Sequence, residues 1–219
     1  MHYNNLQIDW FGHDCFLIQG SKRIMFDPFQ LPTAVMPPVD VLFISHEHFD
    51  HCSIEDIKKV ISSSTVIVTI PDCVSKVSRL KVKNIIPMNP NEKKEVEGLV
   101  VETLPAYNIN KFRSPGLPFH PPEDGRVGFI VAVDNKRVYH AGDTDFIPEI
   151  KSLFNIDVAL VPVSGTYVMT AQEAANAVNT FRPRLAIPMH YGSIVGSLDD
   201  AHKFKELAQV SVEVLDKSA

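Results

Sequence analysis

The segment VDVLFISHEHFDH, residues 39–51, constrains the fold of this chain more than any other stretch. Its first half is almost wholly apolar, which is typical of a strand buried on both faces of a sheet. Such a strand needs covering layers on both sides, so the pattern predicts a layered α/β structure. The second half places three histidines and an aspartate within six positions. We therefore expect this polar cluster to lie on the loop that leaves a central strand.

Strand-like and helix-like segments alternate in the first half of the chain. Three short β-rich runs, LQIDWF, CFLIQ and KRIMFD, are separated by the turn-prone GHD and GSK and predict an antiparallel meander. Further strands are expected at VDVLFIS and TVIVTI and near NIIPM and GLVVETL. The expected helices are IEDIKKVI, with Ser53 as its N-cap, and DCVSKVSRL.

The second half repeats this alternation. Its expected strands are VGFIVAVD, RVYHAGD, VALVPV, LAIPMH and VEVL, and its expected helices are FIPEIKSLF, AQEAANAVNTF and DDAHKFKELAQV. Thr170 and Glu173 have capping-box spacing ahead of the second of these helices. We predict two sheets packed face to face with helices outside, in one domain over residues 1–219.

The two predicted αβ halves span about 1–105 and 127–219. Residues 106–126 between them, AYNINKFRSPGLPFHPPEDGR, are rich in Pro and Gly. We expect this segment to be a long active-site loop without regular structure.

Composition narrows the range of partners and compartments. The formal net charge of -5 and the pI near 6.0 provide no general attraction to nucleic acid or to anionic lipid. No window reaches the roughly 18 apolar residues that span a bilayer, and the N-terminus lacks a secretory pattern. The three cysteines are widely spaced, which favours reduced thiols over a disulfide framework. These features predict a cytoplasmic protein that does not bind membranes.

The polar cluster has the residue types of a metal site. His46 and His48 are two positions apart and project to one side of an extended segment, with Asp50 two positions further on. His51 breaks this period, which suits a second ion close to the first. Imidazole and carboxylate groups bind zinc, manganese or iron. The alternative is a solvated polar loop, but Asp143 and His190 also follow apolar strands, which favours the metal site.

The pattern His-x-His-x-Asp-His, a later Gly-Asp-Thr and a late His resembles the metallo-β-lactamase superfamily of metal-dependent hydrolases. The similarity covers essentially the whole chain, including WFGHDCFLI and Asp27-Pro28. More narrowly, YHAGDT, VPVSGTYVMTAQEAA and IPMHYG resemble the branch that contains bacterial L-ascorbate-6-phosphate lactonase and many uncharacterised hydrolases. The resemblance implies a four-layer αββα sandwich with a dinuclear site at one edge.

Motif matching also implies the roles of single residues. The implied ligands are His46 and His48 for the first ion, Asp50, His51 and His190 for the second, and Asp143 as the bridge between them. Asp27 would support the site from behind unless it is a plain turn residue, and His140 would be supporting or structural. His2, His13 and His202 lack ligand context and are expected to be ordinary residues.

One departure concerns the third histidine of the first ion, which the family takes from the loop between the halves. Asn108 stands where that histidine is expected, and its neutral carbonyl oxygen is a weak donor for zinc. His120, in the same loop, could replace it or could be a solvent-exposed loop residue. We therefore expect one or two divalent ions per chain, zinc first, with manganese or iron as alternatives.

The implied chemistry is hydrolysis of a small-molecule ester, lactone or phosphodiester by a metal-bound hydroxide. Asp50 would accept a hydrogen bond from this nucleophile and shuttle its proton. Lys111 and Arg113 could bind an anionic group of the substrate or be ordinary surface cations. No arm for nucleic acid is evident, and activity on β-lactams does not follow from the family name.

Two other function classes remain. A di-iron redox protein of this fold would resemble His-x-Glu-x-Asp-His, with a carboxylate at the position of His48, and would usually need a flavin domain. A non-enzymatic metal-dependent binder would have lost catalysis through the change at Asn108. The enzyme is favoured because Asp50, Asp143 and His190 are all present.

Overall fold

The computed structural model describes residues 1–33 and 36–218. Within these residues, the first sheet has seven strands in chain order. They are β1 (His2–Tyr3), β2 (Leu6–Trp10), β3 (Phe16–Gln19), β4 (Arg23–Phe26), β5 (Val41–Ile44), β6 (Val66–Thr69) and β7 (Asn84–Pro87). Strands β2 to β4 form the predicted antiparallel meander, and β4 to β7 are parallel. As predicted, β5 lies inside the sheet with all its residues buried.

The second sheet has the order β15-β14-β13-β12-β9-β8. Its strands are β8 (Lys93–Val96), β9 (Leu99–Pro105), β12 (Val127–Val133), β13 (Lys136–His140), β14 (Val158–Pro162) and β15 (Leu185–Met189). Strands β13 to β15 are parallel, and the others are antiparallel. We did not predict β8, and β8 and β9 belong to the second sheet although we assigned residues up to 105 to the first half.

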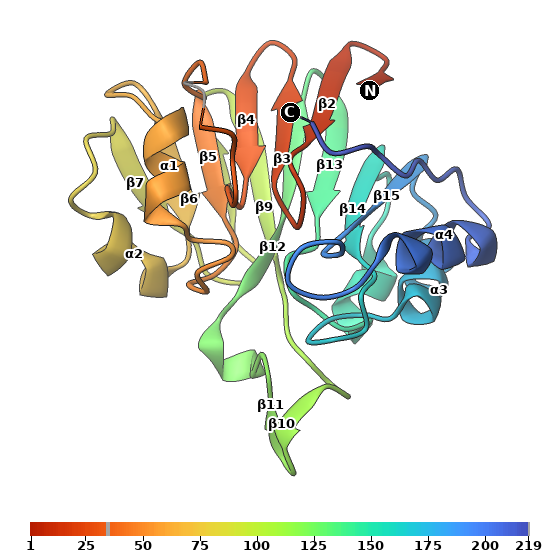
Figure 1. The fold of residues 1–219 in the computed structure, drawn as a ribbon. Coiled ribbons are helices and arrows are strands. Elements are labelled where there is room, and N and C mark those ends of the chain that lie inside the picture. The colour runs from red at the N-terminus through yellow and green to blue at the C-terminus, as the bar shows by residue number, and fades with distance from the viewer. Residues whose placement is uncertain (34–35, 219) are drawn as a thin grey trace.

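The two sheets face each other across one continuous apolar core (Figure 1). Phe43 of β5 contacts Phe129 of β12 with ring centroids 5.2 Å apart. His140 of β13 stacks on Phe26 of β4 at 4.9 Å. Helices α1 (Ile54–Val60) and α2 (Pro71–Val77) belong to the first half, and α3 (Ala171–Phe181) and α4 (Leu198–Leu207) cover the second sheet. This is the predicted four-layer αββα sandwich.

The N-termini of α1 and α3 follow the sequence signals, whereas α2 and α4 end at Val77 and Leu207, three residues before their expected ends. The Ser53 side chain caps α1 by accepting from the Asp56 backbone N–H. Thr170 and Glu173 form the predicted capping box of α3. No helix among residues 1–33 and 36–218 is both long and apolar enough to cross a bilayer. Cys15, Cys52 and Cys73 are buried free thiols, as expected.

The loop 106–126 is more ordered than we predicted. It contains a hairpin of β10 (Phe112–Ser114) and β11 (Leu117–Pro118), followed by the 3₁₀ helix η1 (Pro122–Asp124). Pro115 and Gly116 connect the two strands, and Gly116 has a positive φ of 77°. Proline followed by glycine favours a tight turn because proline fixes φ and glycine tolerates the left-handed region. The hairpin projects from the edge of the sandwich (Figure 1).

Two further predictions were wrong. The segment FIPEIKSLF forms only the 3₁₀ helix η2 (Pro148–Ser152), because the chain is already extended again at Leu153. The expected strand VEVL makes an isolated bridge from Val212 to Ala186 beside β15 and no continuous ladder. The pairing is confined to Ser211 and Glu213, whose backbone groups bond to Ala186 at 2.9 and 3.1 Å.

Candidate metal centre

Five segments deliver polar side chains to one edge of the sandwich. They are the β2–β3 turn, the loops after β5, β13 and β15, and the connection from β9 to β12. Their candidate ligand atoms lie within 4.8 Å of one another inside each group. We define the first cluster as His46, His48, His120 and Asp143. The second cluster consists of His51 and His190 together with Asp50, Asp143, His13 and Asp14.

In the first cluster, hydrogen bonds fix which nitrogen of each imidazole faces inward. The Ser45 hydroxyl donates to Asp27 at 2.6 Å and therefore accepts from Nδ1 of His46 at 3.0 Å. Nε2 of His46 is left facing the cluster, 3.8 Å from Asp143 Oδ2. Burial lowers the pKa of His46 well below its usual value, so this nitrogen keeps a free lone pair.

His48 presents its other ring nitrogen. Its Nδ1 lies 3.2 Å from Nε2 of His46, inside the cluster. Its Nε2 points outward, where Arg126 Nη2 lies at 3.2 Å and Glu47 Oε1 at 3.7 Å. Because a guanidinium can only donate, Arg126 donates to Nε2 in this arrangement and Nδ1 carries the proton. For Nδ1 to bind an ion, the proton would move to Nε2, and Glu47 would be the nearest acceptor for it.

His120 completes the first cluster, and Asn108 does not face it. His120 is buried with Nε2 3.3 Å from Asp143 Oδ2. Asn108 Oδ1 accepts from both the backbone N–H and Nδ1 of His120 at 2.9 Å. The amide nitrogen of Asn108 donates to the Tyr167 carbonyl at 2.7 Å. Asn108 thus orients His120, and the solvent-exposed alternative for His120 does not hold.

Asp143 lies between the two clusters and is buried. Its Oδ2 faces His120 and His46, and its Oδ1 lies 3.4 Å from Nε2 of both His51 and His190. Burial would raise the pKa of this carboxyl, but the neighbouring His190 and His51 outweigh it and hold the pKa well below its usual range. The ionised carboxylate therefore presents one oxygen to the histidines of each cluster.

The two histidines of the second cluster are also held from behind. Asp27 accepts from Nδ1 of His51 at 2.9 Å, which matches the supporting role implied for Asp27. Ser164 Oγ lies 3.0 Å from Nδ1 of His190 and donates to a backbone carbonyl, so it accepts from that nitrogen. Both Nε2 atoms then face inward. Such outer hydrogen bonds fix the ring orientation and the tautomer of metal-binding histidines.

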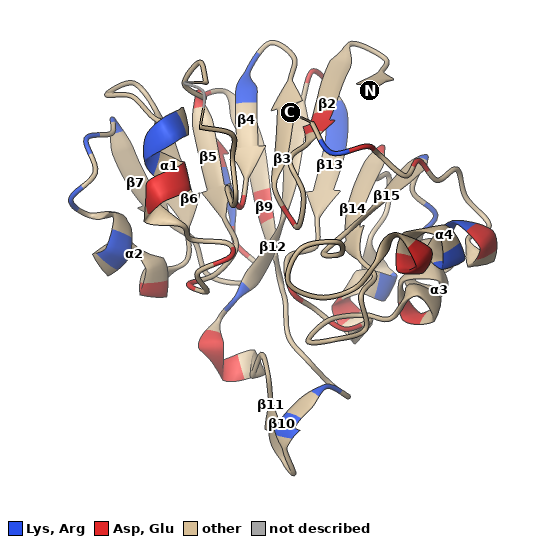
Figure 2. Cartoon of the chain, in the orientation of Figure 1, with Lys and Arg blue, Asp and Glu red and all other residues tan. Residues whose placement is uncertain are grey.

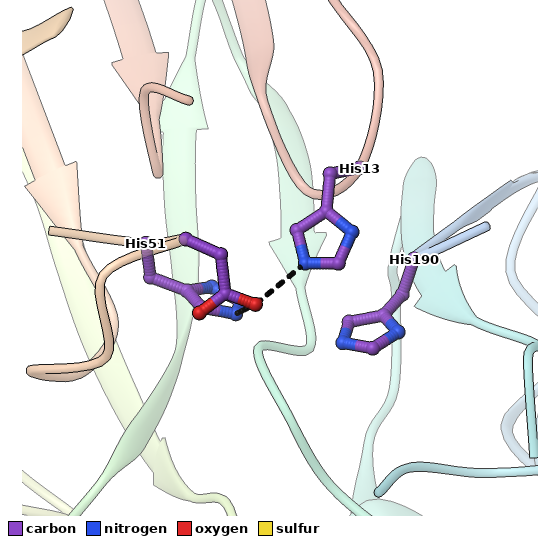
Figure 3. Close-up of side chains that lie close together, drawn as sticks. His13, His51 and His190 are labelled. Atoms are coloured by element: carbon purple, nitrogen blue, oxygen red, sulfur yellow. Dashed lines mark hydrogen bonds and ion pairs between the residues drawn. The ribbon is translucent and has the colours of Figure 1, made fainter. Parts of the chain in front are cut away.

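His13 was expected to be an ordinary residue, but it lies in the second cluster (Figure 3). Its Nε2 contacts Asp50 Oδ2 at 3.0 Å, and its ring centroid is 4.2 Å from that of His190. Burial would raise the pKa of Asp50, but the hydrogen bond from His13 and the charge of His51 lower it to about 2. His13 thus fixes the position of Asp50 and keeps it ionised.

Asp14 is a second residue that the sequence analysis missed. It is fully buried, and Oδ2 lies 3.5 Å from Nε2 of His51. Neither of its oxygens has a hydrogen-bond partner in the part of the chain that the structure describes. The only signal in the sequence was its place in the GHD turn between two short strands.

The remaining predicted residues lie outside both clusters. His140 uses both ring nitrogens for backbone contacts with Asp14 and Gly142, so it is structural. Lys111 pairs with Asp145 at 3.2 Å and Glu173 at 2.7 Å, whereas Arg113 lines a cavity above the clusters. His2 and His202 are exposed, as expected of ordinary residues.

The side chains fit divalent cations. Nε2 of His51, Oδ1 of Asp143 and both oxygens of Asp14 are buried without a hydrogen-bond partner among the described residues. Unpaired buried polar atoms are costly, and a cation between them would satisfy several at once. The first cluster offers mainly imidazole nitrogen and the second adds carboxylates, which are ligand sets for zinc, manganese and iron.

Comparisons with known proteins agree with this geometry. A family model described as a beta-lactamase superfamily domain matches residues 7–190. A UPF0173 metal-dependent hydrolase of Thermoplasma acidophilum is 32% identical over 215 residues, covering 93% of this chain and 91% of that protein. Another, from Pyrococcus abyssi, is 33% identical over 230 residues, with coverages of 96% and 95%. The structure also matches the crystal structure of a protein from Parabacteroides distasonis that is assigned as a metal-dependent hydrolase, with a TM-score of 0.82. The two sequences are 28% identical, and the match covers 95% of this chain and 92% of the other chain.

The sandwich and the histidine and aspartate clusters at its edge define a protein of the metallo-β-lactamase fold class. The family match and the relatives make the assignment specific. The chain belongs to the beta-lactamase superfamily of metal-dependent hydrolases, as the sequence motifs predicted.

Proposed function

We propose that this protein hydrolyses a small-molecule ester, lactone or phosphodiester at a site for two divalent ions. The observation that carries the proposal is the position of Asp143, whose two oxygens face two different histidine clusters. The first cluster would hold one ion through His46, His48 and His120. The second ion would be held by His51 and His190 with the carboxylates around them.

The choice of metal follows from the donor atoms. Three imidazoles and one carboxylate in the first cluster suit zinc. The second cluster contains more carboxylate oxygen, because Asp14 and Asp50 join Asp143, so it also suits manganese or iron. When bound, such ions lower the pKa of water from about 15.7 to near 7 and polarise the bond to be cleaved.

Asp50 is the residue proposed to handle the proton of the attacking water. The side chain of Asp50 is 13% exposed, whereas that of Asp143 is 4% exposed. Asp50 also lines the cavity above the clusters. His13 occupies Oδ2 of Asp50, which leaves Oδ1 to accept a hydrogen bond from the attacking water and to take up its proton. The pKa of about 2 keeps the carboxylate ionised, so it can accept a hydrogen bond from that water and orient it.

Replacing Asp50 by Ala is expected to lower turnover by at least about 100-fold, since positioned acid–base groups contribute that much or more. The assay uses zinc-loaded protein with 4-nitrophenyl acetate, γ-butyrolactone and bis(4-nitrophenyl) phosphate, and metal content is measured on the same samples. Glu213→Ala removes an exposed carboxylate far along the chain from the site and is the control. An Asp50→Ala variant with wild-type turnover would exclude this role, and wild-type protein inactive on every class would count against hydrolysis.

A further inference from the structure

The residues that line the cavity above the clusters indicate which chemical class of substrate the site would take. It has a volume of about 300 Å³, at the small end of the range for ligand sites. His48, His120, Asp50 and Asp143 line it on the side of the metal clusters. The rest of its wall consists of Phe49, Phe119, Tyr167, Ile194 and Arg113.

We infer that the substrate is an anion with an apolar, preferably aromatic, body, and that Arg113 binds its negative charge while the aromatic wall holds the body. This inference rests on the proposed function, because it places the bond to be cleaved at the clusters. It assigns to Arg113 and Phe119 the selection of the substrate.

The first support is that the guanidinium of Arg113 lines the cavity without an ion-pair partner among the described residues. Within the described part of the chain it is the only Lys or Arg that lines the cavity, and it forms no ion pair there. Its guanidinium carbon lies 5.8 Å from the centroid of the Phe119 ring, which stacks it against the wall. Lys111, just before β10, is held by Asp145 and Glu173. Figure 2 shows basic segments on and next to β10 and no acidic segment on the hairpin itself.

The second support is the apolar character of the mouth. Phe49 is 68% exposed and Ile194 is 41% exposed, although both side chains are large and apolar. Phe119 and Tyr167 lie edge to face with centroids 4.7 Å apart and complete an aromatic surface. Exposed apolar groups gathered around a site commonly mark a binding surface. Apart from the candidate metal ligands, this wall offers few hydrogen-bonding groups for a polyhydroxylated sugar.

The cationic side chain in this wall also indicates how many negative charges the substrate carries. One guanidinium neutralises one carboxylate or binds one phosphate oxygen pair, and Arg113 is the one Lys or Arg among the described residues that line the cavity. The cavity therefore favours an aryl or branched aliphatic substrate with one carboxylate or phosphodiester charge.

The test is calorimetric binding of three probes to zinc-loaded protein: 4-phenylbutyrate, its neutral amide 4-phenylbutanamide, and butyrate. Loss of either the charge or the ring should weaken binding about five- to tenfold, the range expected for a half-exposed charged hydrogen bond or a buried ring. Arg113→Gln should abolish the advantage of the carboxylate over the amide, and Arg113→Lys should keep part of it. Phe119→Ala should abolish the advantage of 4-phenylbutyrate over butyrate.

Arg79→Gln, which removes an exposed cation elsewhere, is the matched control and should bind all probes like the wild type. A carboxylate preference that persists in Arg113→Gln but disappears without zinc would show that the metal binds the charge, and would overturn the inference. Equal affinity for all three probes would overturn it too. Binding as predicted without hydrolysis of any ester, lactone or phosphodiester would instead contradict the proposed function alone.

Discussion

Replacing Asp143 by Ala is expected to cost the protein both metal ions and nearly all hydrolytic turnover. This carboxylate is the one group shared by the two clusters, with Oδ2 toward His120 and Oδ1 toward His51 and His190. Without it, the first cluster has no carboxylate, and the second keeps only Asp14 and Asp50, neither of which also faces the first cluster. Elemental analysis of the purified variant, with turnover on the same sample, measures both effects. We expect less than about half an equivalent of metal per chain after dialysis at micromolar free zinc, because each ion then loses one of its ligands and affinity depends on ligand identity and count.

The control for this variant is Asp157→Ala, which removes a largely buried carboxylate far from the clusters. Asp157 accepts from the Arg137 backbone N–H, so the control tests the general cost of losing a buried carboxylate. Thermal unfolding without metal separates loss of folding from loss of binding. An Asp143→Ala variant that is folded and keeps both ions would contradict its bridging position.

The second large effect is expected for His120. His120→Ala should reduce the metal content from about two equivalents to about one, because the first cluster then keeps only two imidazoles. Asn108→Ala should retain both ions at saturating zinc but bind the first about 10- to 100-fold more weakly, the usual cost of losing an outer partner of a ligand. Competition with a chromophoric chelator measures these affinities.

The comparison of the two variants distinguishes a ligand from a residue that orients it. If Asn108 itself held the ion, Asn108→Ala would lose the ion and His120→Ala would keep it. Asn108→His is a further check, since it places an imidazole where the family pattern has one. The hydrogen bonds from His120 to Asn108 Oδ1 would be lost in that variant, so we expect no gain in affinity.

The sequence was sufficient to predict the sandwich and most of the clusters. The apolar runs of β5, β13 and β15 predicted three strands that each end in polar residues. Parallel pairing brings the ends of β13 and β15 to one edge of the second sheet, and the end of β5 meets them from the facing first sheet. His46, His48, Asp50 and His51 follow β5 directly, so their approach to the other groups depended only on the strand order. Regular periodicity carried these predictions.

The contributions of loops could not be predicted in the same way. Whether Asn108 or His120 faces the ions depends on how the chain from β9 to β12 closes, and local residue types do not determine that path. His13 and Asp14 lie in the short turn between β2 and β3. They reach the clusters because this turn lies at the same edge of the sandwich as the other ligand-bearing loops. Pro115-Gly116 indicates the tight turn of the short hairpin of β10 and β11. We missed it because the high Pro and Gly content of residues 106–126 led us to predict a loop without regular structure.

We propose that this chain builds two adjoining metal sites, with His120 completing the first. The most direct measurement is metal content per chain by elemental analysis, on protein purified without chelators and then supplied with zinc, manganese or iron. We predict close to two equivalents of metal per chain. A single equivalent, unchanged in His120→Ala, would contradict the first cluster, and no bound metal after reconstitution would contradict both.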